Sequence, residues 1–389
     1  MKKDLIQKII IFTLLLFMPM SCYGLPIVGV TYGDLMLIIS LLFMLLYMIK
    51  IRVFKIQKKI KPLYFYLLFV MVNSIIVVFL SSNINIFSLL RYLLFVTWSI
   101  CAASISINNK DFFKQYKRIG LIFALYAIFQ TLMFKVSKKI IPADPLKFMF
   151  GNSLINYYNS TNIGYYLNGT LSFRAYSVFL EPSYFAMFEM PLLLYMCNMK
   201  KISKSDLFII VTIMIAMFCG RTITGLLLGF LVIILSFFKN MFKNKKSIVY
   251  LILAIGTLLV LSQTAYFQKL VNLVIATDGG YGTSLNGRIQ NYSIVFGENT
   301  LLNLFGHGIW FESDYLPSIG RILLSFGIFG TIVFTLSYLI SYINLKGYSK
   351  KLFLLFIVSF VGTNSLFNIT SVLWFPLIFG LNGDENDDM

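Results

Sequence analysis

The chain has 389 residues, of which 58% are hydrophobic and only 12% are charged, and its mean hydropathy is +0.82. Soluble domains carry about 25% charged residues, so this composition excludes a water-soluble globule. The formal net charge of +18 comes from short basic clusters between long apolar runs, as in polytopic membrane proteins, and nucleic acid is not an expected partner. Four cysteines without close spacing and a single histidine predict no disulfide framework, no metal and no cofactor.

The apolar runs predict a membrane protein with all-α architecture. A bilayer core about 30 Å thick needs about 20 apolar residues per helix, and this criterion predicts eleven or twelve transmembrane helices in one integral membrane domain, 1–389. The last segment, 352–380, fits either one tilted span or two short helices joined at its polar middle around Asn364. The other expected spans are 9–21, 32–49, 63–80, 87–105, 119–135, 176–198, 207–219, 222–238, 248–262 and 318–343.

The lysine clusters predict the direction of the chain. With the N-terminus in the cytoplasm, most cations fall in short inner loops, above all in the loop 50–61, as the positive-inside rule requires. Two long loops, about 136–175 and 263–317, then face outward. Their Asn, Tyr, Gly and Ser residues suit sugar binding but equally suit ordinary turns. The short first run, which ends before Ser21 and Cys22, also fits a signal peptide.

Arginine and lysine are divided unequally between the two sides. Five of the seven arginines, but only five of the twenty-six lysines, fall on the outer side. A guanidinium group is planar, always charged and matches phosphate oxygens with parallel donors, so outward arginines indicate a phosphate or pyrophosphate ligand. Lipid headgroups or carboxylate partners are the alternative, which weighs most for Arg91. The candidate anion-binding residues are Arg174, Arg221, Arg288 and Arg321.

Acidic residues are rare within the apolar runs. A charge costs roughly 2.5 to 3.5 kcal/mol at the centre of a transmembrane helix, so Glu181 should have a partner or a task. On a continuous helix Arg174 would share nearly the same face. Pro182 predicts a kink beside a cavity, since proline frees a backbone carbonyl. Glu189 is expected to form a buried structural pair.

The second outer loop holds the remaining candidates. His307 is a possible general base near neutral pH, although a lone loop histidine is more often incidental. Glu312 and Asp314 alone would offer a metal ion too few ligands. These two carboxylates therefore do not change the expectation that no metal is bound.

In their order, these motifs resemble the O-antigen polymerases (Wzy-type), within the larger group that includes the O-antigen ligases. The resemblance rests on the block from Arg174 to Phe185, on Gly220-Arg221-Thr222, on Gly287-Arg288, and on the segment 314–318 before a glycine-containing helix. It covers roughly residues 150–335. The first 130 residues are similar only in hydropathy.

The resemblance implies a GT-C-like glycosyltransferase of the bacterial inner membrane whose active site faces the periplasm. Such enzymes transfer a glycan from undecaprenyl pyrophosphate to the non-reducing end of another lipid-linked repeat unit, in lipopolysaccharide biosynthesis, and a chain-length regulator is a possible partner. For this chain, the resemblance implies that the four arginines bind pyrophosphate. Glu181 is the first choice as proton acceptor and Asp314 the second; the alternative role of Glu181 is only to orient Arg174. The resemblance assigns sugar binding to Tyr176, Ser183, His307 and Tyr315.

Two other functions compete with polymerisation. Ligases of the group tend to carry a histidine where this chain has Asp314, which favours a polymerase over a ligase. A lipid-linked sugar flippase or other transporter would place charged groups near the membrane midplane. In this sequence the ionisable candidates gather instead at one face.

Overall fold

The computed structural model of the chain describes residues 3–25, 29–51, 59–80, 85–105, 107–138, 164–167, 170–199, 201–220, 222–241, 300–309, 316–364 and 366–381. The expected helix 248–262 and most of the two expected outer loops lie outside the described residues.

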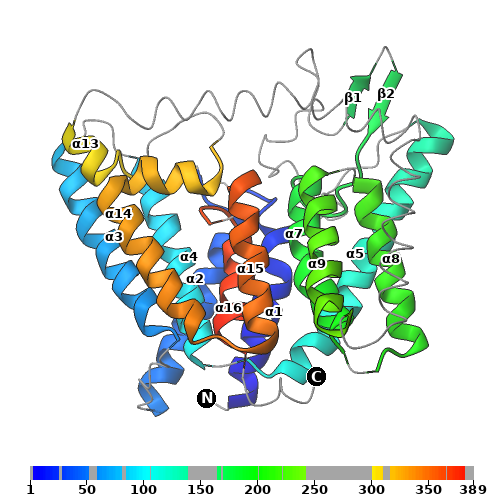
Figure 1. Cartoon of the computed structure of the whole chain (residues 1–389), viewed down its shortest axis with the longest axis horizontal. Coiled ribbons are helices and arrows are strands. Elements are labelled where there is room, and N and C mark those ends of the chain that lie inside the picture. Colours follow the sequence, from blue (N-terminus) through cyan, green and yellow to red (C-terminus); the bar gives the residue numbers. More distant parts are fainter. Residues whose placement is uncertain are drawn as a thin grey trace.

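The described residues form a bundle of helices that run back and forth between two ends (Figure 1). Among them, five helices are long and apolar enough to cross a membrane: α2, α3, α4, α5 and α14. The expectation of a mostly helical, multi-pass membrane protein is confirmed at this level. The elements are α1 (Lys3–Met20), α2 (Tyr32–Ile51), α3 (Lys61–Leu80), α4 (Ile86–Ile105), α5 (Asn109–Ser137), β1 (Gly164–Leu167), β2 (Thr170–Phe173), α7 (Pro182–Cys197), α8 (Lys204–Gly220), α9 (Ile223–Met241), α13 (Thr300–Phe305), α14 (Ser318–Ile343), α15 (Gly347–Gly362) and α16 (Thr370–Phe379).

The two ends of the bundle differ in charge. Segments far apart in sequence meet at the end where α1 begins and α16 finishes (Figure 1). There the Lys59 Nζ donates to the Leu381 carbonyl at 3.0 Å, and Lys117 pairs with Asp206 at 2.6 Å. We call this the basic end. The opposite end, which carries the β1–β2 hairpin and the start of α7, is called the site end.

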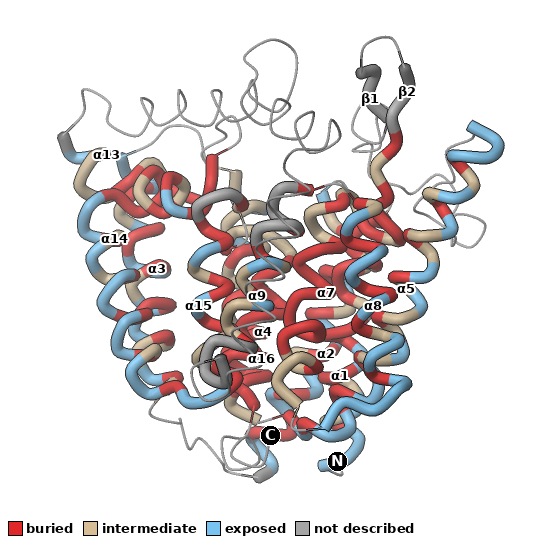
Figure 2. Tube along the Cα trace, turned by 45° about the vertical axis from the view of Figure 1, so that its right-hand side comes forward, coloured by how far each residue is buried: buried red, intermediate tan, exposed pale blue. Residues whose placement is uncertain are grey.

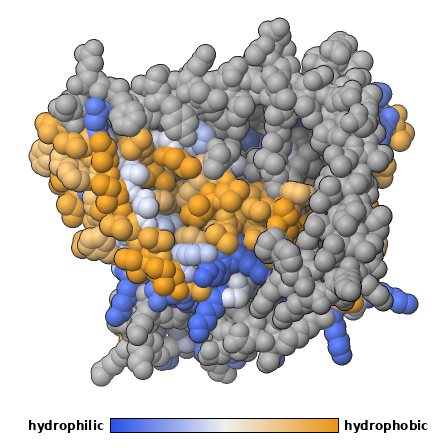
Figure 3. Space-filling model, in the orientation of Figure 1, coloured by the Kyte–Doolittle hydropathy of each residue, from blue (hydrophilic) through white to orange (hydrophobic). Residues whose placement is uncertain are grey.

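The outside of the bundle is apolar, as a lipid-facing surface requires. In α3, for example, Phe65 is 60% exposed and Phe79 is 84% exposed. Figure 3 shows such side chains covering much of the visible face, with hydrophilic side chains towards the basic end. The buried residues concentrate instead in the central helices (Figure 2).

Helix α16 lies at the centre, and all of its residues are buried. It completes the backbone hydrogen bonding of its neighbour α7. Pro191 in α7 has no N–H to donate to the Met187 carbonyl one turn earlier. The Trp374 Nε1 of α16 donates to that carbonyl at 2.9 Å, so no backbone acceptor is left unpaired there, as a membrane interior demands.

The final segment consists of two short helices, α15 and α16, joined by residues 363–369 at the site end. The expected kink at Pro182 is wrong. Pro182 is the first residue of α7, where its missing N–H breaks no helical hydrogen bond. Arg174 and Glu181 also do not share a helix, because α7 begins only after Glu181.

Glu189 is fully buried in α7, and the pairing predicted for it is not found among the described residues. Neither carboxylate oxygen has a hydrogen-bond partner there. The side chain instead faces the bare backbone of Gly120 in α5, where an added Cβ would lie 2.8 Å from the Oε2. Gly120 therefore makes the room that Glu189 occupies.

Helix α14 is broken at Gly327, whose φ of 63° is in the left-handed region. The break packs backbone to backbone against residues 304–308. A Cβ on Gly327 would lie 2.4 Å from the Leu304 carbonyl oxygen, and a Cβ on Gly306 would lie 2.4 Å from the Phe326 nitrogen. Both positions therefore require glycine.

Replacing Gly327 by alanine is expected to lower the free energy of unfolding by about 2 to 6 kcal/mol, because backbone strain and overpacking each cost roughly 1 to 3 kcal/mol. Gly229→Ala is the matched control, since its Cβ would make only ordinary contacts at 3.7 and 3.9 Å. Thermal unfolding of both variants in the same detergent measures the difference. Equal midpoints would contradict the tight crossing at Gly327.

Candidate functional site

The segment between β2 and α7, residues 174–181, is not helical and closes around the end of α8. The Ala175 N–H donates to the Cys219 carbonyl at 3.2 Å. A Cβ on Gly220 would lie 3.2 Å from the Ala175 carbonyl oxygen and 3.7 Å from the Cβ of Pro182. Both ends of the segment therefore meet at Gly220, where a larger residue would push them apart.

This closure brings together sequence positions that were singled out for function. Arg174 precedes Ala175, Glu181 precedes Pro182, and Arg221 follows Gly220. Arg221 itself lies outside the described residues. Ala175 and Pro182, the chain neighbours of Arg174 and Glu181, therefore come close through a closed turn against α8 rather than through a shared helix face.

A glutamine from α5 holds the turn in place. The Gln130 Nε2 donates to the Ser177 carbonyl at 3.0 Å, and the Ser177 N–H donates to the Gln130 Oε1 at 2.9 Å. The Ser177 hydroxyl donates to the Phe123 carbonyl at 2.7 Å. Ser177 has a φ of 55°, an uncommon conformation for a residue other than glycine, and these bonds retain it. Sequence reasoning missed this clamp, although a glutamine inside an apolar helix was its visible signal.

Replacing Gln130 by leucine is expected to destabilise the protein by about 2 to 5 kcal/mol, because two buried backbone groups of Ser177 would lose their partners. Thr131→Val is the matched control, since Thr131 donates only to the Ala127 carbonyl in its own helix. The thermal midpoints of the two purified variants provide the measurement. A Gln130→Leu midpoint as high as that of Thr131→Val would show that the clamp contributes little.

Glu181 stands at the N-terminus of α7 in an extended conformation, with φ −145° and ψ 154°. Its Oε2 accepts a hydrogen bond from the Ser183 hydroxyl at 3.0 Å. The carboxylate is half-buried and makes no capping bond to the helix. It is therefore oriented by Ser183, stabilised by the adjacent helix dipole and still accessible to a substrate group.

Arg174 is half-buried at the other end of the same turn. Phe173, immediately before it, stacks on Phe134 of α5 with ring centroids 5.1 Å apart. Tyr176 is only 1% exposed and packs edge-on against Phe173. This burial disfavours the sugar-binding role expected of Tyr176 and indicates that it anchors the turn below Arg174.

His307 and Arg321 belong to a second group, where the break in α14 packs against residues 304–308. The His307 N–H donates to the Leu324 carbonyl at 2.7 Å, and the Arg321 Nη2 donates to the Ile309 carbonyl at 3.1 Å. Burial lowers the pKa of His307, so its imidazole is mainly neutral at pH 7 and able to accept a proton. Arg321 thus holds the loop that carries His307.

The other predicted site residues, Arg288, Asp314 and Tyr315, lie outside the described residues, as does Glu312. Within the described part of the chain, no three His, Cys, Asp or Glu side chains gather where they could hold a metal ion.

Arg91 has a carboxylate partner, which is one of the alternatives to anion binding that the sequence analysis left open. Its Nη2 lies 2.8 Å from the Asp34 Oδ2, and its Nε donates to the Oδ1 at 3.3 Å. The same guanidinium donates to the Gly29 carbonyl. Arg91 therefore ties α4 to the start of α2 and is not part of the candidate site.

The turn between α15 and α16 adds polar groups at the site end. The Ser318 hydroxyl donates to the Thr363 carbonyl at 2.9 Å, and the Leu366 N–H donates to the Ser318 Oγ at 3.1 Å. The Asn364 Oδ1 is buried and has no hydrogen-bond partner among the described residues. The polar stretch seen in the sequence is thus a turn that holds the start of α14.

Comparison with protein-family models and with curated proteins finds no family and no relative that matches the chain. The residues and their geometry therefore carry the functional interpretation.

Proposed function

We propose that the protein is a membrane glycosyltransferase of the O-antigen polymerase type. It transfers an undecaprenyl-pyrophosphate-linked glycan to the non-reducing end of another lipid-linked repeat unit and releases undecaprenyl pyrophosphate. The observation that carries the proposal is the closure at Gly220, which supports a site built from Arg174, Glu181 and the neighbouring position of Arg221.

The chemistry of these residues fits the reaction. The acceptor hydroxyl forms a bond to C1 of the donor sugar while the bond from C1 to the pyrophosphate oxygen breaks. The guanidinium of Arg174, held by a rigid turn, stabilises the negative charge that develops on the leaving pyrophosphate. The carboxylate of Glu181 accepts the proton of the attacking hydroxyl, in an orientation that its hydrogen bond with Ser183 maintains.

The position of the site supports a periplasmic reaction in a GT-C-like protein of the bacterial inner membrane. The candidate residues lie at the end opposite the basic end, which the positive-inside rule assigns to the cytoplasm. A lipid-linked donor would then keep its polyprenyl chain in the outer leaflet, with its pyrophosphate at the level of Arg174. A chain-length regulator would be the expected protein partner.

Deletion of the gene tests the proposal. Loss of a polymerase leaves lipopolysaccharide with a single repeat unit, visible as a collapsed ladder on a gel. Loss of a ligase leaves long chains on undecaprenyl pyrophosphate, and loss of a flippase leaves single repeat units on the cytoplasmic side. Either of the latter results would overturn the assignment.

A further inference from the structure

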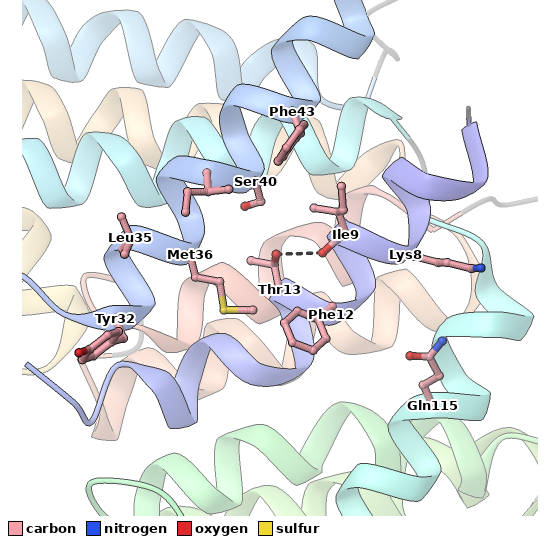
Figure 4. A pocket seen from close by; sticks show the side chains of 11 residues that line it. Lys8, Ile9, Phe12, Thr13, Tyr32, Leu35, Met36, Ser40, Phe43 and Gln115 are labelled. Atoms are coloured by element: carbon pink, nitrogen blue, oxygen red, sulfur yellow. Dashed lines mark hydrogen bonds between the residues drawn. The ribbon is translucent and has the colours of Figure 1, made fainter. Parts of the chain in front are cut away.

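An elongated groove runs between α1 and α2, far in sequence from the candidate site. Its volume is about 630 Å³. Side chains of α1 and α2 form its walls, while Lys8 and, from α5, Gln115 lie together at one end (Figure 4). Tyr32 lies at the opposite end. This size is within the range of pockets that hold small molecules.

The walls of the groove are apolar. Phe12, Ile39 and Phe43 are 59%, 47% and 40% exposed and are among its lining residues. The hydroxyls of Thr13 and Ser40 have partners within the protein: Thr13 donates to the Ile9 carbonyl at 2.9 Å, as Figure 4 shows. The Ser40 Oγ accepts from the Trp98 Nε1 at 2.6 Å. A hydrocarbon chain is therefore the chemistry that the walls fit.

The charged side chain of the groove lies at one end only, which we call its mouth. Lys8 and Gln115 present an ammonium group and an amide at the basic end of the bundle, and none of the described residues that line the groove is acidic. The Asn108 N–H donates to the Gln7 Oε1 at 3.0 Å, which joins α1 to the start of α5 beside this mouth. Lysine is a common point-charge partner of phosphate.

We propose that this groove binds one acyl chain of an anionic phospholipid, with the lipid phosphate at Lys8 and Gln115. The occupant comes from the leaflet at the basic end, where anionic headgroups attract juxtamembrane lysines. The lipid covers wall residues that would otherwise be exposed and holds α1 against α2 and α5. This binding site does not depend on the proposed enzymatic function.

Native mass spectrometry of the full-length protein, released from nanodiscs with equal amounts of phosphatidylglycerol and phosphatidylcholine, tests the proposal. We expect one retained phosphatidylglycerol per chain, and Lys8→Gln should reduce its occupancy about fivefold. Lys3→Gln is the charge control, since Lys3 belongs to the same helix and does not line the groove. Equal retention of the two lipids, or equal effects of the two lysine variants, would overturn the assignment.

A second pair of variants tests the groove itself. Ile39→Trp fills it and should abolish the retained lipid. Ile38→Trp adds the same ring at a neighbouring residue that is 43% exposed and outside the groove lining, so it should leave the lipid in place. Both sites face outward, and both variants are expected to fold. An Ile39→Trp protein that still retains phosphatidylglycerol would place the lipid elsewhere and contradict the proposal.

Discussion

Replacing Glu181 by glutamine is expected to abolish chain elongation while the protein stays in the membrane in its normal amount. The amide keeps the size of the side chain and can still accept a hydrogen bond from Ser183, but it cannot take a proton from an attacking hydroxyl. Loss of a general base lowers the rate by about 10² to 10⁴. A complemented deletion strain should therefore show lipopolysaccharide with a single repeat unit.

The matched control is the same substitution at Glu189, about two turns into α7. Glu189 is fully buried and faces Gly120, so its carboxyl group is out of reach of a substrate at the site end. Glu189→Gln should retain long chains, with at most a lower amount of protein in the membrane. Immunoblotting of the membranes separates the two effects for both variants.

A full ladder from Glu181→Gln would remove this residue from the proton-accepting role. His307 would then be the next candidate among the described residues, because burial lowers its pKa and keeps the imidazole neutral. Ser183→Ala refines the result. It removes the donor at 3.0 Å from the Glu181 Oε2 and should reduce elongation without abolishing it, since the carboxylate remains.

The helices were largely predictable from the sequence because lipid leaves the backbone few alternatives. A backbone inside a membrane must satisfy its own hydrogen bonds, so a long apolar run becomes a helix. The expected span 318–343 coincides with α14 (Ser318–Ile343), and the expected span 63–80 lies within α3 (Lys61–Leu80). The break inside α14 also had a signal in the sequence, Gly327, but the direction of the break could not be predicted.

The geometry of the candidate site was less predictable. The expected span 176–198 missed the start of α7 at Pro182, although a residue before proline avoids the helical conformation and Glu181 is indeed extended. The contact between Gln130 and Ser177 could not be predicted, because it joins segments 47 residues apart. The closure of the turn on Gly220 also depends on the packing of α8, which hydropathy does not encode.

The second large effect is expected from Arg174→Lys, a substitution that keeps the charge. Lysine cannot offer two parallel donors to a pyrophosphate, and a hydrogen bond to a charged group contributes roughly 1.5 to 3 kcal/mol. Losing it in the transition state would slow elongation about tenfold to a hundredfold. The ladder should therefore collapse to short chains, while the turn, anchored by Phe173 and Ala175, stays folded.

Arg91→Lys is the control for that experiment, because Arg91 is an outward-facing arginine whose guanidinium is committed to Asp34. A lysine can keep the ion pair, so normal chain lengths are expected. If Arg174→Lys also gave normal chain lengths, charge alone would suffice at this position and bidentate binding of pyrophosphate would be excluded. If both variants shortened the chains equally, the effect would reflect a general loss of folding rather than a site at the closure on Gly220.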